Sequence, residues 1–122
     1  MDDPVCAHLP EFGARGKVRV TFRHLLTHTA GMDYVNTSGS DSTWEETVAK
    51  ICGVSLRKNW VPGREARYDV SSAWFILGEV VSRKSGMALD GYVHQQIFAP
   101  DLARLSWTAP GSELWTRLAS FP

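Results

Sequence analysis

The sequence lacks an excess of charge of either sign, because its 122 residues include 13 Lys or Arg and 13 Asp or Glu. Surfaces that bind nucleic acid or anionic membranes normally carry a basic patch, and no basic run is present, so we expect neither partner. No apolar stretch of about 18 residues is available to span a bilayer. The first residues are acidic and lack an apolar h-region, so we do not expect them to act as a signal peptide. The 43% of apolar residues and the five tryptophans are enough to build a folded core.

Cysteine is scarce, and the candidate metal ligands are poorly placed. Cys6 and Cys52 show no metal-ligand spacing, so we expect free, buried thiols rather than a disulfide. His24 and His28 stand four residues apart, as two zinc ligands on a helix often do. The glutamate of a His-Glu-x-x-His motif is missing, and no third ligand stands at a diagnostic distance. We therefore expect no metal site, but a solvated His24 and a His28 that holds the helix end.

Start and stop signals predict a mainly α chain with too few strands for a sheet. The first twenty residues read as irregular chain that ends in a short β-prone run at 18–20. Thr21 is a good N-cap for a helix that Gly31 stops. A capping box at residues 43–46 opens a second helix, which should end at Gly53.

The most strongly patterned segment predicts a helix over residues 71–85, which Asp69 or Ser71 can cap. Gly86 supplies its left-handed stop. Further helices are expected over 89–98 and 112–119. In the helix over 71–85, the apolar stripe that we expect to face the core consists of Trp74, Leu77, Val80 and Val81, and Phe75 and Ile76 widen it.

Six segments of the chain together resemble a known protein family, although no single segment would be sufficient evidence. They are residues 2–5, 22–31 (Phe-Arg-His-Leu-Leu-Thr-His-Thr-Ala-Gly), 62–68 (a Pro-Gly turn leading to a tyrosine), 77–86, 97–100 and 117–119. In content and order they resemble the β-lactamase-related serine hydrolases: class C β-lactamases, DD-peptidases and esterases of the same fold. Ala30 stands where that family usually has serine.

The resemblance implies that residues 1–122 form a partial domain, the mainly helical part of the family's α/β fold. It also implies acyl transfer from a small ester or amide substrate through a serine, with no cofactor. The family places a Ser-x-x-Lys nucleophile pair ahead of the segment similar to residues 2–5, and a Lys-Thr-Gly or His-x-Gly motif near its end. The sequence has neither motif in those places. We therefore expect a fragment that is inactive alone and that self-associates through an uncovered domain face.

Tyr68 is the residue to which the resemblance assigns catalysis. An acyl-transfer serine needs a base that takes its proton, and a phenol can serve when a neighbouring cation stabilises the phenolate. From the residues alone, Tyr68 could equally pack its ring on the following helix. The family's lactamases and peptidases show Tyr-x-Asn here, whereas this chain has Val70 in the third position. That difference favours the esterase-like branches. Asp69 fits an N-cap better than a substrate ligand.

A literal Ser-x-x-Lys does occur, at Ser55 to Lys58. A nucleophile of this kind belongs at the start of a long buried helix, but residues 59–63 (Asn-Trp-Val-Pro-Gly) cannot continue one. We therefore do not expect Ser55 to be a nucleophile. Two other interpretations stay open: a non-catalytic remnant of the same fold that binds a peptide or small ester, and a plain helical interaction module.

Overall fold

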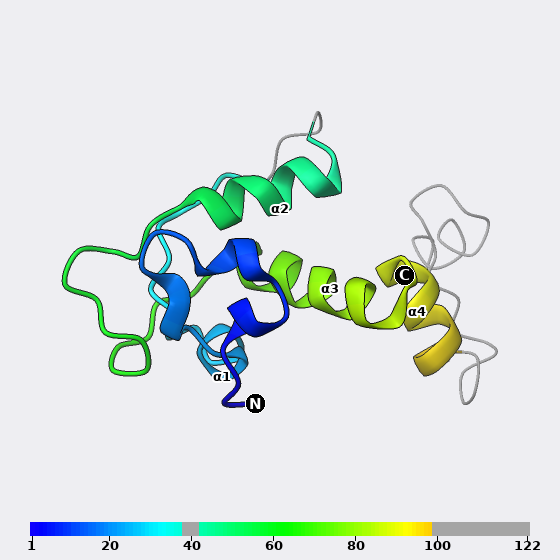
Figure 1. The fold of residues 1–122 in the computed structure, drawn as a ribbon, viewed down its shortest axis with the longest axis horizontal. Helices are drawn as coiled ribbons and strands as arrows, with labels where there is room; N and C mark the ends of the chain where they lie inside the picture. Colours follow the sequence, from blue (N-terminus) through cyan, green and yellow to red (C-terminus); the bar gives the residue numbers. More distant parts are fainter. Residues whose placement is uncertain (38–41, 99–122) are drawn as a thin grey trace, which may run out of the picture. The chain divides into compact units, whose positions relative to one another are not determined.

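The computed structural model describes residues 1–37 and 42–98. Its described residues divide into two units, one over Met1–Lys84 and one that begins at Ser85. The expected helix at 112–119 lies outside the described residues. In chain order the elements are the 3-10 helices η1 (Val5–Ala7), η2 (Pro10–Gly13) and η3 (Lys17–Arg19), the helices α1 (Phe22–Leu26), α2 (Trp44–Gly53), α3 (Ser72–Ser85) and α4 (Leu89–Val93), and the π-helical turn η4 (His94–Phe98) (Figure 1).

The described residues are helical, as predicted, and contain only two isolated β-bridges, Pro4 with Thr21 and Met32 with Leu56. None of the helices in this part of the chain is long and apolar enough to cross a membrane.

Local capping signals explain where the helices begin. At α2, the Glu46 carboxylate accepts from the Thr43 amide at 2.9 Å, and the Thr43 hydroxyl accepts from the Glu46 amide at 3.2 Å. This is the predicted capping box. At α1, Thr21 is the N-cap as expected, but the imidazole of His24 takes the place of the glutamate. The expectation of a solvated His24 was therefore wrong.

Two sequence predictions are wrong, one for the residue at which α1 ends and one for the segment that precedes α1. The helix ends at Leu26 rather than at Gly31, because His28 adopts a left-handed conformation with φ +57°. The first two residues of the β-prone run at 18–20 lie in the 3-10 helix η3 instead, and Val20 alone is extended. The reason is Lys17, whose fully buried ammonium donates to the carbonyls of Cys52, at 3.0 Å, and of Val54.

This contact places a cation at the C-terminal end of α2, where helix carbonyls lack partners within the helix. Burial lowers the pKa of Lys17. Burial also raises the pKa of the neighbouring Cys52 thiol to about 11. Cys52 and the half-buried Cys6 are both free thiols, as the sequence predicted.

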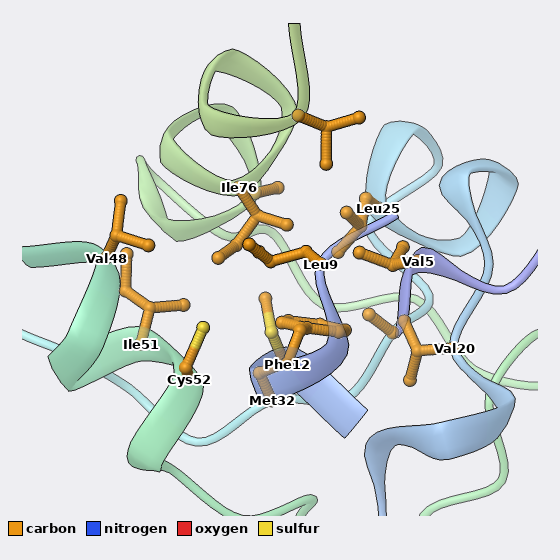
Figure 2. Packing of buried hydrophobic residues seen from close by; sticks show 13 residues of the cluster. Val5, Leu9, Phe12, Val20, Leu25, Met32, Val48, Ile51, Cys52 and Ile76 are labelled. Carbon is orange, nitrogen blue, oxygen red and sulfur yellow. The ribbon is translucent and has the colours of Figure 1, made fainter. Parts of the chain in front are cut away.

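The core of the first unit forms where α1, α2 and α3 meet the N-terminal 3-10 helices. Figure 2 shows Ile51 of α2 and Ile76 of α3 converging on Leu9 and Phe12, all four of them fully buried. The thirteen buried apolar residues of this cluster include members of every element from η1 to α3 except η3. The 3-10 helices η1 and η2 therefore form part of the core rather than an irregular leader.

The buried face of α3 matches the predicted stripe only in part. Ile76 and Val80 are buried as expected, whereas Trp74 is 55% exposed. Leu77 packs only partly against the core. The small Ala73, which was not expected in the stripe, is buried in place of Trp74.

Candidate active site

The turn that follows α1 is hydrogen-bonded to the loop that precedes α3, although α2 separates the two segments in the sequence. The carbonyl of Thr29 accepts from the Gly63 amide at 3.1 Å and from Trp60 Nε1 at 3.1 Å. The carbonyl of Gly31 accepts from the Arg57 amide at 2.9 Å. The two motifs that carry the family resemblance most clearly therefore form one structural unit.

Gly31 is required at its position for two separate reasons. Its φ of +75° belongs to the left-handed region, which side chains disfavour. In addition, a Cβ placed on Gly31 would lie 1.9 Å from Cδ1 of Trp60. The indole therefore lies directly against the glycine backbone while its Nε1 bonds the same turn. Trp60 thus acts in packing the site, and it is not among the residues that line the pocket described below.

Tyr68 projects from this docked loop with 73% of its surface exposed. Its ring lies 4.8 Å, centroid to centroid, from the imidazole of His28 at an interplanar angle of 47°. The residues on either side are bonded to the same histidine. The Arg67 amide donates to the His28 carbonyl at 2.9 Å, and the Asp69 amide donates to His28 Nδ1 at 3.2 Å. The tyrosine backbone is therefore held on both sides, while its hydroxyl bonds no other described residue.

Asp69 caps α3, as the sequence suggested. Its Oδ1 accepts from the amides of Ser71, at 3.0 Å, and Ser72, at 2.7 Å. A carboxylate at this position also complements the partial positive charge of the helix N-terminus. Because both bonds use the carboxylate, Asp69 is a structural residue of the loop. Tyr68 is consequently fixed between a histidine-bonded turn and a capped helix.

A pocket opens beside Tyr68 and involves residues that sequence reasoning did not single out. Tyr34 and Val70 line it and are 73% and 67% exposed. Arg67 and Asp69 are the charged residues among its lining. No pattern in the sequence marks Tyr34 or Arg67, since both reach the pocket through the chain's long-range folding. The cavity volume is about 60 Å³. Small-molecule sites typically enclose roughly 300–1,000 Å³, so the described residues alone form only part of one.

The alternative site residues are placed away from this pocket. Ser55 and Lys58 are exposed in a non-helical segment and do not line it, which agrees with the rejection of a local nucleophile pair. His24 and His28 each use Nδ1 as an acceptor, for the amides of Thr21 and Asp69. Among residues 1–37 and 42–98, no group of three or more His, Cys, Asp or Glu side chains could hold a metal ion.

Comparison with solved structures identifies this architecture. A penicillin-binding protein homologue from Caulobacter crescentus superposes with a TM-score of 0.63 at 26% identity, covering 81% of this chain and 27% of that one. A candidate beta-lactamase from Bacteroides dorei DSM 17855 superposes with a TM-score of 0.66 at 28% identity, covering 81% and 30% of the two chains. The fold is therefore that of the penicillin-binding proteins and beta-lactamases.

The sequence comparison gives the family itself. The profile of the Beta-lactamase family matches residues 1–119, so the chain belongs to that family. It is also similar to esterase EstB of Burkholderia gladioli, with 30% identity over 120 residues that cover 82% of this chain and 30% of the esterase. The resemblance drawn from the six motifs is confirmed. The chain spans about a third of the length of these relatives.

Proposed function

We propose that this chain supplies the tyrosine-bearing wall of an active site that hydrolyses an ester or amide through a serine acyl-enzyme. The observation that carries the proposal is the presentation of Tyr68. Its ring stands at the rim of the pocket, its backbone is held on both sides, and its hydroxyl is exposed. Buried tyrosines that serve only packing usually find a partner for the hydroxyl, whereas a proton-transfer group must leave that atom accessible.

In this reaction, Tyr68 accepts the proton of the attacking serine as the serine oxygen bonds to the substrate carbonyl. The resulting tetrahedral intermediate collapses when the proton passes to the leaving alkoxide or amine, and an acyl-serine remains. Water then attacks the acyl-serine, losing a proton to the same phenolate, and the serine recovers that proton as the acid departs. The family resemblance assigns the serine and the cation that stabilises the phenolate to a Ser-x-x-Lys pair.

An ester is the favoured substrate class. Val70 lines the pocket where the lactamases and peptidases of the family carry an asparagine, and valine cannot donate to a substrate carbonyl or amide. Esters have better leaving groups than amides and depend less on such a donor. The similarity to an esterase supports the same choice.

The test is a chimera in which this chain replaces the matching stretch of the Burkholderia gladioli esterase. We expect Tyr68→Phe to lower the acylation rate for p-nitrophenyl butyrate by about 10²–10⁴-fold, the usual effect of losing a positioned acid or base. Tyr92→Phe, at a half-buried tyrosine of α4, is the matched control and should retain activity. Full esterase activity in Tyr68→Phe would contradict the catalytic assignment.

A second candidate is a binding module of the same fold without catalysis, which the exposed apolar residues that line the pocket, Tyr34 and Val70, favour. It is tested on the chain alone with the same ester. Chemical-shift changes at Tyr68 without release of nitrophenolate would support binding only. Release that is lost in Ser55→Ala would instead show that Ser55 is a nucleophile.

The exposed apolar residues also support self-association of the chain. Tyr34, Tyr68, Val70 and Trp74 are each more than half exposed, and contiguous apolar surface commonly marks an interface. We expect the chain alone to bind a hydrophobic dye and to sediment as more than a monomer. A monomer without dye binding at high concentration would contradict this.

A further inference from the structure

His28 contacts each of three consecutive residues around Tyr68, and each contact uses a different part of the histidine. Its carbonyl accepts from the Arg67 amide at 2.9 Å. Its ring face lies 4.8 Å from the Tyr68 ring. Its Nδ1 accepts from the Asp69 amide at 3.2 Å. No other described side chain is recorded in a bond or ring contact with all three.

The backbone conformation does not by itself require a histidine at this position. With φ +57°, His28 lies in the left-handed region, which glycine adopts most readily and in which asparagine, like histidine, is enriched. A helix end alone would be served at least as well by glycine or asparagine. The residue present instead supplies a ring and an acceptor nitrogen, and both point at the loop that carries Tyr68.

We propose that His28 is a positioning residue, which sets the direction of the Tyr68 side chain for proton transfer. The inference rests on the proposed function for its catalytic consequence, although not for its geometry. The Nδ1 bond fixes the peptide that follows Tyr68, and the ring contact limits rotation of the phenol. The hydroxyl is thereby held at the rim of the pocket.

The bond to Asp69 also dictates which nitrogen of His28 carries the proton. An acceptor at Nδ1 requires the neutral imidazole with its hydrogen on Nε2, since imidazolium has no acceptor nitrogen. Nitrogen NMR of the chain should therefore show His28 as the Nε2–H tautomer. A spectrum with the proton on Nδ1 would overturn the proposal, because the bond to the Asp69 amide could not exist.

Two variants separate the roles of ring and acceptor. His28→Phe keeps a ring against Tyr68 but removes the acceptor, so exchange of the Asp69 amide hydrogen should accelerate by about 10-fold while that of Arg67 stays protected. His28→Asn suits the left-handed backbone and restores an acceptor, so it should recover most of the Asp69 protection. His24→Phe removes the same kind of acceptor from the cap of α1 and controls for general destabilisation. Unchanged Asp69 exchange in His28→Phe would overturn the proposal.

The catalytic consequence is measured in the esterase chimera. His28→Phe should lower kcat by about 10- to 100-fold with little change in KM, because a displaced general base mainly affects the chemical step. His28→Asn should recover part of kcat. An equal loss in His24→Phe, or an unchanged kcat in His28→Phe, would refute positioning. If Tyr68→Phe keeps full activity, the proposed function fails, while the exchange measurements still decide whether His28 holds the loop.

Discussion

Replacing Gly31 by alanine should damage the site more than a comparable substitution elsewhere. The added methyl group carries two costs. The first is the left-handed backbone, with φ +75°, which costs a residue with a Cβ about 1–2 kcal/mol. The second is the collision with Trp60, whose Cδ1 would lie 1.9 Å from the new carbon. To escape, the indole must leave the turn and lose its bond to the Thr29 carbonyl, about 1 kcal/mol, together with its packing.

The total loss expected for Gly31→Ala is about 3 kcal/mol or more in the free energy of unfolding, measured by urea denaturation. Gly16→Ala is the matched control, since Gly16 has φ +88° and no atom within 4 Å of the position of a Cβ. It should cost only the backbone term of about 1–2 kcal/mol. The difference between the two variants then isolates the contact with Trp60. If both variants lose the same stability, the close packing of Trp60 on Gly31 is refuted.

Three further predictions concern the core, the cap and the thiols. Ile76→Ala should cost about 2–5 kcal/mol in chemical denaturation, because Ile76 is fully buried; a loss below about 0.5 kcal/mol would mean that α3 packs through another face. Asp69→Ala should cost about 0.5–2 kcal/mol and Asp69→Asn much less, because asparagine also caps the helix; equal losses would exclude capping. At pH 8, iodoacetamide should modify Cys6 well before Cys52, whose buried thiol has a pKa raised to about 11. Since the thiolate reacts, the Cys52 rate should rise about tenfold per pH unit below that value, and early modification of Cys52 in peptide mapping would refute its burial.

The parts of the fold that the sequence predicts correctly are those that neighbouring residues determine. The capping box at residues 43–46 and the left-handed stop at Gly86 depend on atoms a few residues apart, and both are present. The run at 18–20 is different, because the burial of Lys17 against the end of α2 overrides its β propensity. Trp74 was predicted to face the core from its helical spacing, yet the smaller Ala73 lies on the face that packs.

The candidate site, too, has features that the sequence predicts and features that it does not. Tyr68 and the two turns can be found from the sequence, since motifs and spacing mark them. The bonds that join those turns cannot, because they connect Thr29 to Gly63 and His28 to Arg67 through backbone groups that every residue possesses. Pocket residues such as Tyr34 likewise leave no local signal. Only the folded chain shows that His28, first considered as a metal ligand, contacts the tyrosine loop.

The bonds between the two turns also bear on the order in which the chain folds. Helices α2 and α3 form through hydrogen bonds between residues near in sequence. The loop that carries Tyr68 is different, because its bond between Asp69 and His28 joins residues that are 41 positions apart. Closing such a loop costs conformational entropy before any contact repays it. We expect the tyrosine loop to assemble after the helices and to open before them, as a separate unit of native-state hydrogen exchange. Substitutions in the turn after α1 should then increase this partial opening more than they increase global unfolding.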